Sequence, residues 1–151
     1  MCHKLSQGFA LVTAIFLLVV LSALGAYLLS IASIQHTSAS LDVMGARAYQ
    51  AARAGIEWGA FQVLQNSGGT FATNCAAGPT SVDMTFAPAA LTGLTTTVTC
   101  SASALQESGN TVTMYQIIST ACSIPTAGAC PNANPGSGDY VERQLQATVG
   151  Q

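Results

Sequence analysis

The sequence has very little charge. Only 7% of its 151 residues are charged, against about a quarter in an ordinary globular protein. Its four lysines and arginines do not gather into the basic patch by which proteins bind nucleic acid, so we expect no nucleic-acid partner. Between residues 9 and 32 there is neither a charge nor a proline, and the first proline of the chain is Pro79.

Catalytic motifs are missing as well. The sequence contains no glycine-rich phosphate loop, no Gly-x-Ser-x-Gly element and no His-Glu-x-x-His element. Of its two histidines, His3 precedes the apolar run and His36 has polar neighbours, so a solvated side chain is the simpler interpretation. We therefore expect no enzyme, no cofactor and no metal, although the oxygen-rich segment 132–139 leaves a calcium site as an alternative.

An uncharged apolar run, residues 9–32, follows a short polar segment, residues 1–8. As a helix with a rise of about 1.5 Å per residue, the run is about 36 Å long, enough to cross a bilayer core of roughly 30 Å. Lys4 in front of it favours a cytoplasmic N-terminus and an exported remainder. A plain membrane anchor fits this length, whereas a cleaved secretory signal has a shorter apolar core of about 7–15 residues.

The helical pattern continues beyond the apolar run. The first cluster of turn residues is the segment 66–69, so one helix is predicted over about residues 9–65. A seam of small residues lies on one face of its second half, at spacings of three and four: Gly45, Ala48, Ala52, Gly55 and Gly59. Small residues allow another backbone to come close. Three arrangements are open at this point: the seam packs on a sheet of the same domain, on neighbouring helices, or on both along different parts of the helix.

The rest of the sequence has the composition of a β-sheet. Four segments show the alternation or the threonine and valine content of strands: 82–86, 94–101, 111–121 and 140–149. A turn signal at 108–110 separates two of them, and the last strand places Arg143 on an otherwise apolar face. These features predict an antiparallel sheet of three to four strands with one face free to cover the helix.

Four of the five cysteines belong to the part that is expected to be exported: Cys75, Cys100, Cys122 and Cys130. An even number in an oxidising compartment predicts two disulfides. Of the three pairings open to them, the short loop between Cys122 and Cys130 favours that pair together with Cys75–Cys100. A zinc site is the alternative, but the sequence has no Cys-x-x-Cys spacing to support it.

Two stretches resemble a known family. The junction 8–12, Gly-Phe-Ala-Leu-Val, resembles the prepilin signature, and the segment 51–60, AARAGIEWGA, resembles the stem of minor pilins of the PilX kind. Among these, the chain looks most similar to biogenesis subunits of MSHA-type type IV pili. The resemblance covers residues 8–65 and continues more loosely to the C-terminus. It implies an α+β pilin fold, with a long helical spine packed against a small β-sheet head.

The resemblance also implies how the chain is processed and where it acts. A prepilin peptidase would cut between Gly8 and Phe9 and methylate the new amino group of Phe9. The implied partners are other major and minor pilins and an inner-membrane assembly platform, and the implied location is the bacterial inner membrane and then the pilus filament. Most pilins carry a glutamate, thought to pair with a neighbour's N-terminal amine, where this chain has Thr13. An uncharged residue there favours a minor subunit.

Four parts follow from this interpretation: a leader 1–8, a transmembrane and filament-core helix 9–32, a periplasmic half of the helix 33–65, and a disulfide-bonded β head 66–151. Alternative interpretations are a minor pseudopilin of a type II secretion system, a tip subunit that binds a ligand directly, and a membrane-anchored enzyme.

Within the helix, Arg53 and Glu57 are one turn apart and predict a surface ion pair.

Overall fold

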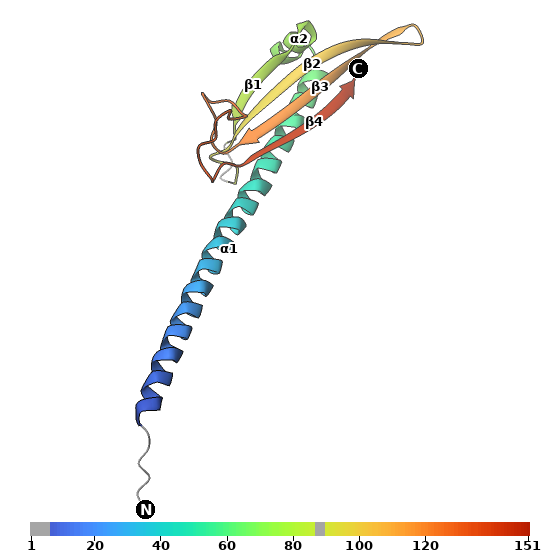
Figure 1. The fold of residues 1–151 in the computed structure, drawn as a ribbon. Helices are drawn as coiled ribbons and strands as arrows, with labels where there is room; N and C mark the ends of the chain where they lie inside the picture. Colours follow the sequence, from blue (N-terminus) through green and yellow to red (C-terminus); the bar gives the residue numbers. More distant parts are fainter. Residues whose placement is uncertain (1–6, 87–89) are drawn as a thin grey trace, which may run out of the picture. The chain divides into compact units, whose positions relative to one another are not determined.

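The computed structural model describes residues 7–86 and 90–151, with the side chains of 7–10 and 33–34 left aside (Figure 1). The elements follow in the order α1 (Gln7–Leu64), α2 (Thr70–Ala77), β1 (Thr80–Thr85), β2 (Thr95–Glu107), β3 (Asn110–Cys122) and β4 (Glu142–Gly150). They form two compact units, Met1–Ser40 and Leu41–Gln151, and α1 contributes to both. The predicted α+β architecture is confirmed.

The described part of the first unit is helical and apolar. The helix has a mean hydropathy of 2.5 over its most apolar window and is long and apolar enough to cross a membrane. Two of its hydroxyls bond back to carbonyls of the same helix: the hydroxyl of Ser22 donates to Val19 O at 2.9 Å, and that of Ser38 donates to Gln35 O at 3.2 Å. Helix geometry pairs the backbone groups within the segment, as a bilayer requires.

The second unit contains one antiparallel sheet in the order β1-β2-β3-β4, so each strand pairs with its neighbour in the sequence (Figure 1). All four predicted strands are present. The turn between β2 and β3 consists of Ser108 and Gly109, whose φ angles of 50° and 85° are both positive, as a tight two-residue hairpin requires. The two longest strands, β2 and β3, therefore form a hairpin of 13 residues on each side.

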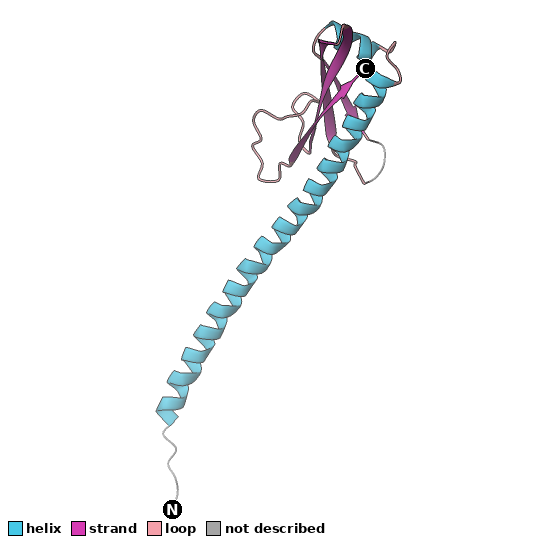
Figure 2. Cartoon of the chain, turned by 90° about the vertical axis from the view of Figure 1, so that its right-hand side faces the viewer, coloured by secondary structure: helices cyan, strands magenta, loops and turns pink. Residues whose placement is uncertain are grey.

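The part of α1 that belongs to the second unit packs on one face of this sheet (Figure 2). Two apolar clusters fill the space between them. One gathers around Val63, Val98 and Ile117, and the other around Ala52 and Ala121, all of which are fully buried. The C-terminal third of α1 is thus a component of the core of the second unit.

The short helix α2 was not predicted. It is preceded by Gly69, which offers no side-chain cap, and it follows the turn residues that end α1. Its stability comes from burial, because Phe71, Ala72 and Cys75 all face the core and Cys75 is disulfide-bonded to β2. Helices this short depend on such packing rather than on their intrinsic propensity.

Candidate functional site

The expected processing junction lies at the start of α1. Residues 1–6 of the expected leader lie outside the described residues. Gly8 and Phe9 follow Gln7, the first residue of α1, and Thr13 lies one turn after Phe9. No aspartate, glutamate, lysine or arginine occurs from residue 7 to residue 41, so the helix surface around Thr13 offers no partner charge of its own.

The apolar side chains of the first unit are exposed in the isolated chain. They include large residues with more than half of their surface open: Leu11, Val12, Ile15, Phe16, Leu17, Leu18, Val19, Leu21, Leu24, Tyr27, Leu28 and Leu29. A surface of this size and composition requires a lipid or protein environment. By length and composition, the apolar part of this helix could therefore span a membrane.

The seam of small residues faces the chain's own sheet, and all five of its residues are buried. Gly55 makes the closest approach: a methyl group there would lie 2.2 Å from Oγ of Ser119 and 2.9 Å from methyl groups of Thr96 and Val98. At Gly59, a methyl group would lie 2.9 Å from Ile117 Cγ2. The seam between residues 45 and 59 is thus filled within the second unit, which leaves its small residues no room for a neighbouring helix.

Two hydroxyls are buried at this contact. Oγ1 of Thr96 and Oγ of Ser119 are both inaccessible, and neither has a hydrogen-bond partner in the described structure. An unpaired buried hydroxyl generally destabilises a fold. Here the small side chain of Ser119 allows the helix backbone at Gly55 to come so close. At this position the close packing outweighs the cost of an unpaired hydroxyl.

Arg143, the one charged residue on the apolar face of β4, is accommodated by the first glycine of the seam. A methyl group at Gly45 would lie 3.0 Å from Nη2 of Arg143. The guanidinium group remains exposed, and its Nη1 donates a hydrogen bond to Glu142 O at 2.9 Å. The stem of the side chain therefore covers the helix while the charge stays in solvent.

The opposite face of α1 is polar around Arg53 and Glu57. The predicted ion pair is present, with Nε of Arg53 3.0 Å from Oε1 of Glu57. Both side chains are more than half exposed, so the pair contributes only a few tenths of a kcal/mol.

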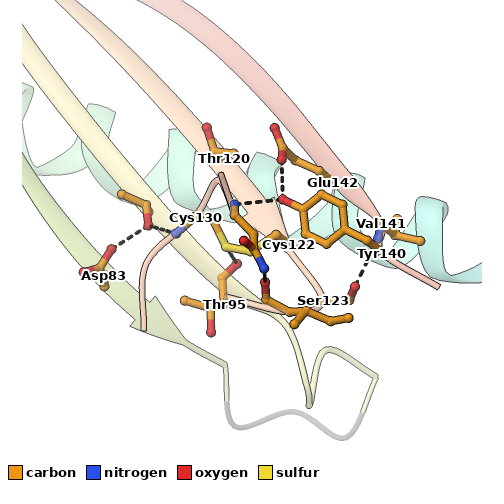
Figure 3. Close-up of a disulfide and its surroundings, with 12 residues drawn as sticks. Asp83, Thr95, Thr120, Cys122, Ser123, Cys130, Tyr140, Val141 and Glu142 are labelled. Atoms are coloured by element: carbon orange, nitrogen blue, oxygen red, sulfur yellow. Dashed lines mark hydrogen bonds between the residues drawn. A yellow bond between two sulfur atoms is a disulfide. The ribbon is translucent and has the colours of Figure 1, made fainter. Parts of the chain in front are cut away.

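The four cysteines of the second unit form Cys75–Cys100 and Cys122–Cys130, the pairing that the sequence favours. The first disulfide joins α2 to β2. The second closes the start of the long connection between β3 and β4 and holds it over the sheet face opposite to α1 (Figure 3). Both bonds thus attach non-strand segments to the central hairpin.

Under that connection, the hydroxyl of Thr97 in β2 is buried and has partners on both sides. The backbone N–H of Cys130 donates to Oγ1 of Thr97 at 2.7 Å, and the Thr97 hydroxyl donates to Oδ1 of Asp83 at 2.5 Å (Figure 3). This relay connects the disulfide loop, β2 and β1. It satisfies the Thr97 hydroxyl on the sheet face opposite to α1.

Tyr140 ties the end of the connection to β4. Its hydroxyl donates to the carboxylate of Glu142 and accepts a hydrogen bond of 3.0 Å from the backbone N–H of Asn132 (Figure 3). Burial, helped by the bond to Glu142, raises the pKa of Tyr140 above its ordinary value, although the N–H of Asn132 opposes this shift. The neutral phenol is therefore the form that the folded unit favours.

In the segment considered for calcium, two side-chain oxygens accept internal hydrogen bonds. Asn132 donates from Nδ2 to Ile124 O at 3.0 Å and accepts from the N–H of Asn134 at 2.9 Å, and the N–H of Asp139 donates to Oγ of Ser137. Among the described residues, no three His, Cys, Asp or Glu side chains come together as metal ligands would.

One feature of the second unit was missed in the sequence. A pocket opens between α1, α2 and β1, with Trp58 and Phe71 among its lining residues. Its only sequence signal is the tryptophan itself, the single one in the chain, which stands near the end of the predicted helix. Without α2, which was not predicted, the second wall of the pocket could not be foreseen.

Comparison with protein-family models, curated proteins and solved structures finds no match to this chain. The chain itself has an α+β architecture, one helix long and apolar enough to span a membrane, and two disulfides. Its function is therefore argued from these features.

The close approach at Gly55 predicts that Gly55→Ala destabilises the second unit by about 1–3 kcal/mol, the usual cost of overpacking a core. The measurement is chemical unfolding of the detergent-solubilised chain. Gly25→Ala is the matched control, because nothing lies within 4 Å of a methyl group there. Equal stability of the two variants would show that the helix does not pack this closely.

The raised pKa of Tyr140 predicts alkaline sensitivity. The folded state holds the phenol proton more tightly, so this stabilisation is complete below the ordinary tyrosine pKa of about 10 and is lost as the pH rises through the raised value. Tyr140→Phe should lower the free energy of unfolding by about 1 kcal/mol at neutral pH. It should also make the alkaline fall of this free energy shallower, because the variant has no phenol at residue 140 to ionise. The control is Tyr49→Phe, at an exposed position on α1. An unchanged slope in Tyr140→Phe would contradict this assignment.

Proposed function

We propose that this chain is a minor pilin-like subunit that takes part in the assembly of a type IV pilus, of the MSHA type and the MshP kind. One observation carries the proposal: α1 starts beside the Gly8–Phe9 junction, exposes uncharged apolar side chains from Leu11 onward, and ends in the core of a disulfide-bonded sheet unit. A plain anchor needs only the exposed apolar side chains.

The apolar part of α1 dictates how such a subunit moves. Exposing its large side chains to water would cost on the order of 20–40 kcal/mol, at about 1.5–3 kcal/mol for each of them. The helix therefore passes from the bilayer to a filament only where apolar helices of other pilins replace the lipid. Insertion in the bacterial inner membrane and storage there before assembly follow from the same requirement.

Thr13 suits a minor place in the filament. In a pilin of the usual kind, a buried carboxylate at this position needs the N-terminal amine of a neighbour, because an unpaired buried charge is strongly unfavourable. A threonine imposes no such pairing, so this subunit enters the filament without the charge pair that aligns a repeating one. We infer that it works beside the major pilin rather than in its place.

The disulfides suit the exported side. The second unit carries both of them, and such bonds persist in oxidising compartments such as the periplasm. In this proposal a prepilin peptidase removes residues 1–8 on the cytoplasmic side and methylates Phe9. An inner-membrane assembly platform then transfers the subunit to the other pilins.

Processing tests the proposal directly. Mass analysis of the protein from its native cell should find a methylated Phe9 as the first residue, because a prepilin peptidase cuts after the glycine. Gly8→Ala should retain residues 1–8 and stay out of the filament, whereas Gly25→Ala, in the same apolar helix, should be processed normally. Retention of residues 1–8 in the unaltered protein, or normal processing and assembly of Gly8→Ala, would overturn the proposal.

A further inference from the structure

The pocket between α1, α2 and β1 belongs to the second unit and has a volume of about 330 Å³. Its lining combines the rings of Trp58 and Phe71 with the amides of Gln62 and Asn74 and the hydroxyls of Thr80 and Ser81. Its volume lies at the lower end of the range of about 300–1,000 Å³ that is typical of small-molecule sites. Pilus assembly, as proposed above, gives this pocket no role.

Two aromatic rings form the apolar part of the pocket. Phe71 is buried in the core, and the centroid of its ring lies 4.8 Å from that of Trp58, with the ring planes inclined by 60°. Such a tilted pair is a favourable arrangement that fixes both rings. Trp58 itself is only half-buried, so a rigidly held indole borders the pocket.

The polar groups of the pocket have hydrogen-bonding capacity to spare. Oε1 of Gln62 accepts a hydrogen bond of 2.8 Å from Nδ2 of Asn66, which orients the amide and leaves its Nε2 group unused within the described structure. The side chains of Asn74, Thr80 and Ser81 make no hydrogen bond to the described residues either. Two amides and several hydroxyls therefore border the same pocket as the indole.

No residue that lines the pocket is charged. An anion or a cation would thus be desolvated there without compensation, and a purely apolar ligand would leave the amides and hydroxyls unpaired. A ligand that offers both neutral hydroxyls and an apolar C–H face satisfies both halves of the lining. Neutral sugars have this combination.

We propose that this pocket binds a neutral saccharide, with its C–H face on the indole of Trp58 and its hydroxyls on the amides of Gln62 and Asn74. The main competitor is an extended peptide that pairs with the free edge of β1 and inserts one side chain into the pocket. Its main-chain bonds would go to β1, so it would use fewer of the polar side chains that line the pocket.

Trp58 is the only tryptophan of the chain, so its fluorescence reports on this pocket alone. The full-length chain is kept in a phosphocholine detergent, which carries no sugar. It is titrated with maltose, lactose, cellobiose and diacetylchitobiose and applied to an array of neutral glycans. At least one saccharide should bind on the array and change the fluorescence in a saturable way, whereas sodium sulfate should not. The absence of any saccharide binding would overturn the proposal.

Matched variants separate this pocket from other surfaces. Asn74→Ala should weaken binding of that saccharide about three- to tenfold, the loss expected for one hydrogen bond, while Gln146→Ala, on exposed β4, should not change it. Trp58→Phe removes the fluorescent reporter, so its saccharide binding is measured by calorimetry. This variant should bind more weakly while the chain stays folded. Equal affinity of Asn74→Ala and the unaltered chain, or binding of extended peptides in place of saccharides, would contradict the assignment.

Discussion

The second unit depends on the close contact between α1 and the sheet at Gly55 and Gly59. A single added methyl group at Gly55 would overlap Ser119, and one at Gly59 would press on Ile117. Packing this tight makes the end of α1 an integral part of the core. In the proposed role, the end of the helix that begins in a membrane or filament is therefore a component of the core of the second unit.

Scarce charge shapes both units in different ways. In the first unit its absence leaves a helix that requires an apolar environment. In the second unit, neutral hydroxyls connect segments through hydrogen bonds, where an ordinary domain would often use ion pairs. Thr97 connects Cys130 to Asp83 beneath the disulfide loop, and Tyr140 connects the end of that loop to Glu142. The disulfide Cys122–Cys130 keeps these groups together, so the loop covers the sheet without an apolar core of its own.

Much of the fold could be predicted from the sequence because its signals are local. The absence of proline and turn residues predicted a helix over about residues 9–65, and α1 spans Gln7–Leu64. Alternation predicted the strands, and even the placement of Arg143 on the inner face was correct, since its partner Gly45 makes room for it. Loop length and the even number of cysteines favoured the disulfide pairs that form.

What could not be predicted depends on tertiary contacts. The helix α2 has a weak sequence and forms because Phe71 and Cys75 are buried, which no local pattern reveals. The strand β2 runs to Glu107, beyond the expected end at residue 101, because β3 pairs with it along its whole length. The sequence also left open which surface packs against the small-residue seam. The pocket at Trp58 could not be predicted, because α2, which forms one of its walls, was not predicted.

Amide hydrogen exchange of the full-length chain in lipid nanodiscs tests the central claim most directly. If the end of α1 is part of the core of the second unit, the amides of residues 48–63 should exchange as slowly as those in the centres of β2 and β3, and lose protection together with them in denaturant. Fast exchange along residues 48–63 while the sheet stays protected would show that the helix is only attached to the head, and the account would fail.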